Sequence, residues 1–341
     1  MIESLANGML MSRAYSGMRE LGIDADEVMR RCGLNLPSDR TVYASVEEQL
    51  ARHRLFWPQL EAVSDDAFIG LHLGEVVPVL SGQIIEYLFM SSPNFKEGLI
   101  RCIKYTRLLT DLFQSRVELD DNPCALTFDI PDIDYGYVAH MFDCVLVGNI
   151  RFFQHLTGGA FKPIKVSLTR AAPEDTQEYE RVFQCAVEFS ASSNTISFDR
   201  EILALGSLHA DAGLLLMHEK IADEQILQIE KRDLLMEARQ VIGELLETGG
   251  LSLEVVAERL GMTGSRLRAH FAELETSFNQ VLSDYRFELA RELLGQTEEP
   301  IDQIVYLTGF SEPSTFYRAF KRWTGTTPIV YRRQVRNPDT A

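Results

Sequence analysis

The feature that most constrains this chain is an internal repeat in its last third. Residues 251–271 read LSLEVVAERLGMTGSRLRAHF, and residues 299–320 read EPIDQIVYLTGFSEPSTFYRAF. In each copy an apolar helical pattern is followed by a glycine, a small hydroxyl residue and a second helical pattern. Two short helices joined by a tight turn of this kind form a helix-turn-helix. The repeat therefore predicts two such units and excludes a β-sheet for this part of the chain.

The residues of each copy meet the physical needs of a tight turn between helices. Gly261 and Gly309 permit the positive φ that the turn requires. Thr263 and Ser311 are predicted to cap the second helix, because a hydroxyl oxygen accepts a hydrogen bond from a free backbone N–H. Apolar residues should anchor the helices from behind, namely Val256, Ala257, Leu260, Leu267 and Phe271 in the first copy and Ile304, Val305, Leu307, Phe316 and Phe320 in the second.

The outward face of each second helix is polar. An arginine on such a face can pair with both O6 and N7 of a guanine in the major groove of DNA. The pattern therefore favours sequence-specific DNA binding by helices that lie in the groove. The outward residues are Ser265, Arg268 and Ala269 in the first copy and Glu312, Pro313, Ser314 and Arg318 in the second.

A single amphipathic helix is predicted between the copies, over residues 277–294, and Gly295 is expected to end it. Such a helix would hold the two units in a fixed relation, so that they read successive major-groove sites. Residues 209–247 are helical, with a polar segment at 220–232, and no strand pattern follows. We therefore predict a first domain over residues 1–232 that ends in a helical linker, and an all-α domain over residues 233–341.

The first domain mixes helical and strand patterns, which favours an α+β fold. Residues 116–130 alternate around a turn at 121–123, as a half-buried hairpin does. Further strands are predicted at 164–168, 187–189 and 195–198, with a helix at 176–183. Earlier helices are predicted after a capping box at 45–48 and over 95–109, the latter with Ser92 as its cap and Pro93 in its first turn.

Charge is distributed unevenly along the chain. The sequence has 33 Lys and Arg against 50 Asp and Glu, a net charge of −17. Residues 1–238 contribute −15 and residues 239–341 contribute −2. Residues 313–336 contain six basic side chains and no acid. Because charge acts locally, this basic segment fits a polyanionic partner even though the whole chain is acidic.

Other classes of protein find little support in the sequence. No run approaches the roughly 18 apolar residues that cross a bilayer, and the first residues lack the pattern of a secretory signal, so we expect a cytoplasmic protein without membrane contact. The five cysteines and seven histidines are scattered, and we expect neither a metal nor a cofactor. No GxSxG, P-loop or dinucleotide-binding glycine pattern occurs, so an enzyme is not expected.

Several segments resemble the AraC/XylS family of bacterial transcription regulators. They are residues 301–311, 316–322 and 325–332, which read IDQIVYLTGFS, FYRAFKR and GTTPIVYR. The first domain is similar, through residues 70–74, 168–173 and 187–189, to the effector-binding domain of the ornithine-utilisation-regulator type. The resemblance implies an α+β sensory domain followed by an all-α double helix-turn-helix domain.

The resemblance also implies which residues contact DNA. The base-reading positions are Ser265, Arg268, Ala269, Pro313, Ser314 and Arg318, of which Ala269 and Pro313 depart from the polar types common in the family. Phosphate contacts are expected from Thr263, Arg266, Ser311, Lys321, Arg322 and Arg332. Glu275 stands where the family usually has glycine, so a left-handed residue there would be strained. Phe310, Phe316 and Trp323 are expected in the core, because reading a duplex needs no aromatic platform.

These observations predict an effector-responsive transcription regulator, and the resemblance implies that it is an activator. A small-molecule effector would bind the first domain, which would also form a homodimer, and the second domain would bind double-stranded promoter DNA. The resemblance further implies recruitment of RNA polymerase and a place in the bacterial cytoplasm at the nucleoid. No effector-binding residue can be named from the sequence. Two alternatives stay open: a helical adaptor that binds another protein, and an enzyme that processes a metabolite.

Overall fold

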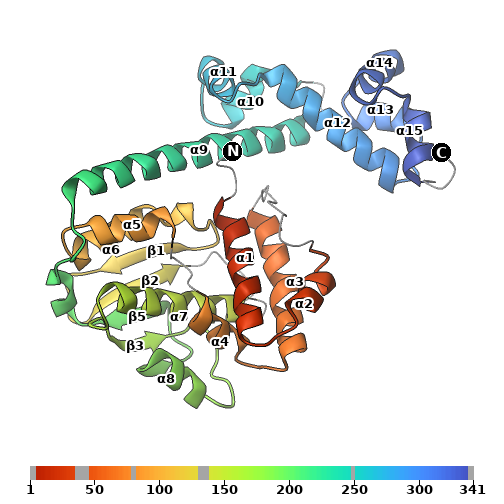
Figure 1. Ribbon diagram of the computed structural model, residues 1–341. Helices are drawn as coiled ribbons and strands as arrows, with labels where there is room; N and C mark the ends of the chain where they lie inside the picture. Colours follow the sequence, from red (N-terminus) through yellow and green to blue (C-terminus); the bar gives the residue numbers. More distant parts are fainter. Residues whose placement is uncertain (1–4, 35–45, 78–81, 130–137, 247–249, 337–341) are drawn as a thin grey trace. The chain divides into compact units, whose positions relative to one another are not determined.

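The computed structural model describes residues 5–34, 46–77, 82–129, 138–246 and 250–336 (Figure 1). The chain divides into two compact units, residues 1–227 and 228–341. The division falls inside one long helix, α9 (Ala212–Leu245), and the boundary predicted near residue 232 lies in the same helix. Ser45 of the predicted capping box and Ile130 of the predicted hairpin lie outside the described residues.

The first unit contains a five-stranded sheet, and the predicted α+β class is confirmed. The strands lie in the order β1-β2-β5-β3-β4, and neighbours are antiparallel except for β3 and β4. β1 and β2 form the predicted hairpin, in which Val117 pairs with Leu126. The three later strands each begin one residue before the predicted start. The bounds are β1 (Gln114–Glu118), β2 (Cys124–Asp129), β3 (Pro163–Ser167), β4 (Ala186–Glu188) and β5 (Asn194–Phe198).

The first unit also contains helices and 3-10 turns. Those of the first unit are α1 (Leu5–Glu20), α2 (Ala25–Arg31), α3 (Val46–Ser64), α4 (Ile69–Val76), α5 (Ile84–Ser91), α6 (Phe95–Lys104), α7 (Ala139–Leu156) and α8 (Gln177–Phe183), with 3-10 turns η1 (Thr106–Leu108) and η3 (Arg200–Ala204). The helix predicted over 176–183 is confirmed as α8. The helix predicted over 95–109 is shorter, because α6 ends at Lys104 and only the 3-10 turn follows.

The cap predicted for α6 is wrong. Asn94, not Ser92, is the N-cap, and its side-chain oxygen accepts a hydrogen bond from the N–H of Glu97 at 3.0 Å. The Ser92 hydroxyl instead donates to the carbonyl of Leu88 at 2.6 Å, at the end of α5. Ser92 therefore serves the preceding helix, and Asn94 is the residue placed directly before the first helical turn.

A cluster of phenylalanine rings joins helices α5, α6 and α7 to the sheet. Its members are buried, and the centroids of neighbouring rings lie 5.1 to 6.2 Å apart. Rings at these separations attract one another beyond the gain from burial, which is itself about 1.5–3 kcal/mol for a phenylalanine. The members are Phe89, Phe95, Phe152, Phe153, Phe161 and Phe198.

The second unit is built from helices, and its described residues contain no strand, so the predicted all-α class is confirmed. In Figure 1, α10 and α11 lie at one end of α12, and α13 to α15 gather around the other end. With the later part of α9, the helices are α10 (Leu253–Arg259), α11 (Gly264–Glu273), α12 (Phe278–Gln296), α13 (Ile301–Leu307), α14 (Pro313–Thr324) and α15 (Pro328–Arg336).

Two apolar clusters form the core of the second unit. The first includes Ala238 and Ile242 of α9 together with Leu267 and Phe271 of α11. Val281 near the start of α12 completes it. The second cluster contains Ala290, Leu294, Ile304, Val305, Phe310, Phe316, Ala319 and Phe320. Because α12 contributes side chains to both clusters, this one helix holds the two helix-turn-helix units together.

The predicted end of the connecting helix is wrong by two residues. Ser277 caps α12, and its side-chain oxygen accepts a hydrogen bond from the N–H of Gln280 at 3.2 Å. The helix then continues through Gly295 to Gln296. The N–H and the hydroxyl of Thr297 both donate to the carbonyl of Leu293, at 3.2 and 2.8 Å. These bonds close the last turn, and a single helical glycine costs only about 1 kcal/mol.

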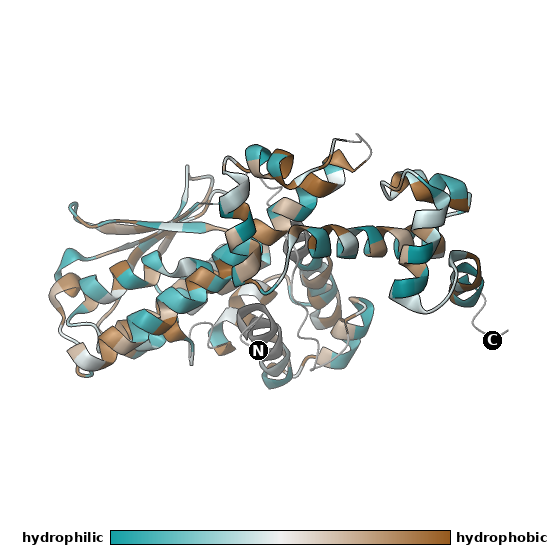
Figure 2. Cartoon of the chain, turned by 90° about the horizontal axis from the view of Figure 1, so that it is seen from above, coloured by the Kyte–Doolittle hydropathy of each residue, from teal (hydrophilic) through white to brown (hydrophobic). Residues whose placement is uncertain are grey.

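Within the described residues, no helix has both the length and the apolar character needed to cross a membrane. Figure 2 shows hydrophilic and hydrophobic residues interspersed along the long helices. In the same part of the chain, no three His, Cys, Asp or Glu side chains gather where they could hold a metal ion.

Candidate nucleic-acid interface

The first candidate reading helix, α11, follows α10 across a tight turn. Gly261 in this turn has φ +67°. Thr263 is the N-cap of α11, and its side-chain oxygen accepts a hydrogen bond from the N–H of Arg266 at 3.3 Å. Leu267 and Phe271 are buried behind the helix. The predicted turn, cap and apolar anchors of the first copy are thus confirmed.

The end of α11 carries the unusual residue Glu275. Its φ is +53°, a left-handed conformation that favours glycine. The N–H of Thr276 bonds to the carbonyl of Phe271 at 2.9 Å, and the N–H of Glu275 bonds to that of Ala272 at 3.0 Å. These two bonds make a Schellman motif, which requires the left-handed residue. The strain that the sequence implied at Glu275 is therefore present.

The second candidate reading helix, α14, begins differently. Gly309 in its turn has φ +70°, as predicted. Ser311 does not cap the helix: the N-cap is Glu312, whose side chain makes no cap hydrogen bond, and Pro313 occupies the first turn. Proline has no N–H, so one fewer backbone donor needs a partner there. The N–H groups of Thr315 and Phe316 bond to the backbone carbonyl of Glu312, at 3.1 and 3.3 Å.

The predicted aromatic core of the second copy is present. Phe310, Phe316 and Phe320 are buried. Trp323 is partly buried, and its indole N–H donates to the hydroxyl of Ser283 on α12 at 3.1 Å. These rings support α14 from behind and are not presented for stacking on bases.

The six predicted base-reading side chains are all exposed: Ser265, Arg268, Ala269, Pro313, Ser314 and Arg318. Five of the six predicted phosphate-contacting residues are exposed as well, namely Thr263, Arg266, Ser311, Lys321 and Arg322. Arg332 differs, because it is partly buried and its Nη2 donates to the carbonyl of Glu299 at 2.6 Å. Two basic helix faces are therefore open to a partner, whereas Arg332 also supports the chain itself.

Among the described residues, the two arginines at the predicted base-reading positions have only weak partners. Arg268 Nη2 lies 3.7 Å from Glu254 Oε1, and the two side chains are 68% and 71% exposed. Arg318 donates from Nε to the Ser314 carbonyl at 3.3 Å and from Nη2 to the Thr315 hydroxyl at 3.4 Å. An exposed ion pair contributes at most about 1 kcal/mol. Both guanidinium groups can therefore exchange these partners for an outside acceptor.

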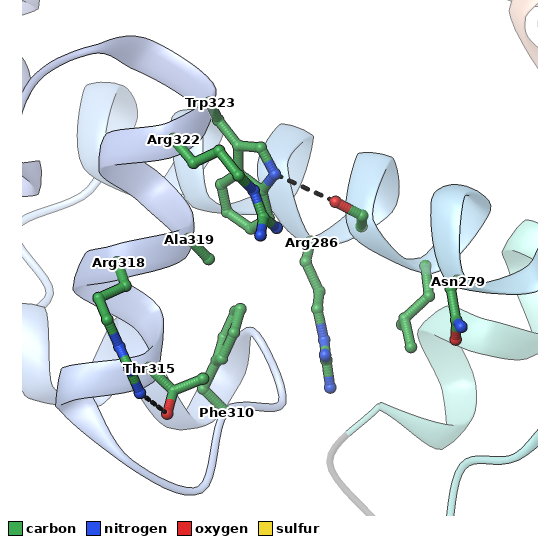
Figure 3. A pocket seen from close by; sticks show the side chains of 10 residues that line it. Asn279, Arg286, Phe310, Thr315, Arg318, Ala319, Arg322 and Trp323 are labelled. Atoms are coloured by element: carbon green, nitrogen blue, oxygen red, sulfur yellow. Dashed lines mark hydrogen bonds between the residues drawn. The ribbon is translucent and has the colours of Figure 1, made fainter.

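A basic cavity of about 400 Å³ adjoins the second reading helix (Figure 3). Arg286 of α12 and Arg318 and Arg322 of α14 lie on its walls, and the described residues that line it include no acid. Arg286 Nη2 donates to the Gly309 carbonyl at 2.7 Å, and its guanidinium lies 4.7 Å from the centre of the Phe310 ring. Burial lowers the pKa of Arg286, but an arginine remains charged in proteins.

Sequence reasoning missed Arg286. It lies in the middle of the predicted connecting helix, and the only signal was a single basic residue beside the apolar positions Leu282 and Tyr285. Its position against the Gly309 turn depends on how α12 packs, which no local pattern reveals.

These features define the class of the protein. A helical unit with exposed, polar reading helices and a basic cavity follows an α+β unit, which is the organisation of a DNA-binding transcription regulator. Residues 22–206 match the arabinose-binding N-terminal domain of AraC transcription regulators, and residues 256–334 match a helix-turn-helix domain. The first match alone covers more than half of the chain. This protein belongs to the AraC family.

Curated relatives of the chain are also described as regulators. The ornithine utilization regulator of Pseudomonas aeruginosa is 28% identical over 278 residues, which cover 80% of each chain. An uncharacterised helix-turn-helix regulator of Mycobacterium bovis is 25% identical over 324 residues, or 92% of each chain. Among solved structures, the transcriptional regulator CdpR of Pseudomonas aeruginosa aligns with 84% of this chain and 96% of its own, at 22% identity and a TM-score of 0.41.

Proposed function

We propose that this regulator activates transcription in response to an effector and reads promoter DNA with both helix-turn-helix units. The observation that carries the proposal is the exposure of all six base-reading side chains on α11 and α14. In this proposal residues 1–232 sense the effector, and residues 233–341 bind DNA. A transcription regulator of this kind needs no catalytic turnover.

The contacts divide into two kinds. Arg268 and Arg318 pair with guanine edges, and Ser265 and Ser314 add weaker polar contacts. Ala269 and Pro313 can touch only apolar groups such as a thymine methyl. Thr263, Arg266, Ser311, Lys321, Arg322 and Arg332 contact phosphates, which position the protein without reading sequence.

The protein is further proposed to act as a homodimer. On α9 the apolar side chains of Leu214, Met217 and Ile221 are 49%, 61% and 42% exposed. Their spacing of three and four residues places them on one face of the helix. A second copy covering that face would remove it from water. The expected result is that Ile221→Glu shifts the full chain toward the monomer in sedimentation velocity, whereas Lys220→Glu on the neighbouring face does not.

Two further parts of the proposal follow from promoter binding. Activation requires contact with RNA polymerase, and promoter DNA places the protein in the cytoplasm at the nucleoid. A reporter gene placed behind the promoter that the protein binds tests the direction of regulation, because loss of the regulator lowers expression from an activated promoter.

The central experiment measures promoter binding by two variants of the full chain, one that removes an arginine and one that removes a lysine. Arg318→Ala is expected to weaken the free energy of promoter binding by about 1–3 kcal/mol and to relax the base preference at one position of the site. Lys321→Ala, three residues along the same helix, should weaken binding to all sequences alike. It should also reduce the slope of log affinity against log salt concentration by about one. Fluorescence anisotropy with a set of single-base promoter variants at several salt concentrations distinguishes the two patterns.

The same measurement separates this function from the alternatives. If both variants lose affinity equally on every sequence, base reading by α14 is wrong. If the full chain protects no DNA segment from cleavage at low salt, the adaptor becomes the better account. Conversion of a metabolite by the purified chain would favour the enzyme.

A further inference from the structure

The first unit contains a small cavity between the β1-β2 hairpin and the helices α3, α5, α6 and α7. Its volume is about 110 Å³. The sheet contributes Leu126 and Phe128, and the helices contribute Leu99, Met141 and Phe153. For comparison, an apolar cavity of about 150 Å³ in another protein holds benzene. The cavity here is smaller, so a molecule of about benzene size is the largest that it would hold.

The described residues that line this cavity include no Asp, Glu, Lys or Arg. Burial raises the pKa of the Cys102 thiol, which stays neutral. Removal from water lowers the pKa of His53 to about 4, so the imidazole is also neutral near pH 7. A charged ligand would lose its hydration here without gaining an opposite charge, which is strongly unfavourable. The cavity therefore selects against ions.

One polar group of the wall has a defined role. The indole N–H of Trp57 donates to Nδ1 of His53 at 3.1 Å. Because the indole can only donate, Nδ1 must be the acceptor, and the proton of the neutral ring sits on Nε2. Asn149 uses its amide nitrogen to donate to the Val145 carbonyl at 2.8 Å. His53 is therefore a neutral group of the wall, which also contains the hydroxyl groups of Thr106, Thr110 and Ser115.

We propose that this cavity is the effector site and that it takes an uncharged, mainly apolar molecule of about benzene size. The proposal rests on the effector-responsive function above and names the ligand class of that site. It excludes free sugars, which would leave most hydroxyls unpaired in this wall, and charged amino acids such as ornithine.

The position of the cavity suits an effector. Leu99, Cys102 and Ile103 of α6 line it. The other side of the same helix holds α9, because Arg101 Nε lies 2.9 Å from Glu219 Oε1 and the Tyr105 hydroxyl, just after α6, donates to Asp223 at 2.7 Å. A ligand that shifts α6 therefore acts directly on the helix that continues into the second unit.

The test uses Trp57 as a built-in reporter. The chain has two tryptophans, so the full-length Trp323→Phe variant leaves Trp57, bonded to His53, as the only one. Cyclohexanol is the uncharged probe, and cyclohexylammonium is a charged probe of almost the same shape. Fluorescence and thermal shift are measured without DNA, so that the result does not depend on promoter recognition.

Cyclohexanol is expected to change Trp57 fluorescence saturably at millimolar concentration and to raise the melting temperature. Cyclohexylammonium, arabinose and ornithine should bind at least tenfold more weakly. Val145→Phe, which fills the cavity, should abolish binding, whereas Ile100→Phe on the exposed face of α6 should not. His53→Leu, which replaces the imidazole in the wall, should weaken binding about tenfold and serves if Val145→Phe does not fold.

Three results would overturn the proposal while leaving DNA binding intact. They are the absence of a saturable response to cyclohexanol, equal binding of cyclohexylammonium, and undiminished binding by both Val145→Phe and His53→Leu. Failure of the promoter experiment with a positive result here would instead leave a ligand-binding protein whose second unit has another partner.

Discussion

The first helix-turn-helix unit, α10 with α11, and the second, α13 with α14, differ in where each reading helix is stabilised. α11 has a side-chain cap at its start, from Thr263, and the strained Glu275 after its end. α14 has no side-chain cap at its start and a relaxed glycine, Gly325 at φ +76°, after its end. Two copies of one motif thus use opposite ends of the reading helix to gain stability.

The turns of the two units differ in how closely other residues pack against their glycines. A Cβ added to Gly261 would meet no described atom within 4 Å. A Cβ added to Gly309 would lie 2.9 Å from Leu246 Cδ1 and 3.0 Å from the Leu246 carbonyl. Arg286 bonds to Gly309 from the other side. The second reading helix is therefore held by its neighbours, whereas the first is held mainly by its own cap and its buried face.

The largest expected effect is at the packed turn. Gly309→Ala should lower the free energy of unfolding of the second unit by about 3 kcal/mol, from left-handed strain of about 1 kcal/mol and overpacking of about 1–3 kcal/mol. Gly261→Ala, which adds only the strain, should cost about 1 kcal/mol. Urea unfolding followed by Trp323 fluorescence, in a Trp57→Phe background, measures both. Equal losses would mean that the two turns are alike after all.

The next effect concerns the arginine behind the second turn. Arg286→Met keeps most of the volume but removes the bond to Gly309 and the contact with Phe310, and should cost about 2 kcal/mol. The matched control is Arg259→Met beside the first turn, because Arg259 has only a weak exposed pair with Glu244 at 3.7 Å. That change should cost less than about 0.5 kcal/mol. The same unfolding measurement applies, and a larger loss in the control would contradict the comparison.

At the starts of the two helices, the expected loss of stability is smaller and affects the first unit more than the second. Thr263→Ala should lower stability by about 1 kcal/mol, because the N–H of Arg266 loses its partner. Ser311→Ala, at the corresponding place before α14, should change stability by less than about 0.5 kcal/mol. Hydrogen exchange of the first turn of each helix localises the effect. A larger increase in exchange in α14 after Ser311→Ala than in α11 after Thr263→Ala would show that Ser311 is the real cap.

The smallest effect is a gain. Glu275→Gly relieves left-handed strain of about 1 kcal/mol but adds freedom to the unfolded chain, so the net gain should be about 0.5 kcal/mol. Glu275→Ala is the control, because it removes the charge and keeps the strain. Only the glycine variant should raise the melting temperature. A gain of the same size in the alanine variant would assign the effect to charge.

Much of this architecture could be inferred from local patterns. The period of the apolar residues located both helix-turn-helix units, because burial of one face imposes that period. It also located the starts of the three later strands within one residue and the start of β1 within two. The end of α6 was predicted five residues too late, at residue 109 instead of Lys104. Three other terminal details were wrong, at Ser92, Ser311 and Gly295. Each has a local cause. The Ser92 hydroxyl donates to the Leu88 carbonyl, and a proline in the first turn of α14 lowers the need for a cap at Ser311. Thr297 closes the helical turn beyond Gly295.

The outward faces of α11 and α14 follow from periodicity. The resemblance to the AraC/XylS family implied which of their residues contact DNA, so these residues could be proposed before any coordinates. The contact of Leu246 with Gly309, the place of Arg286 and the uncharged cavity beside His53 could not. Each joins residues far apart in the chain, and such meetings depend on how helices and sheet pack against one another. Local chemistry specifies which face of an element is buried, but the identity of its neighbours comes from three-dimensional packing.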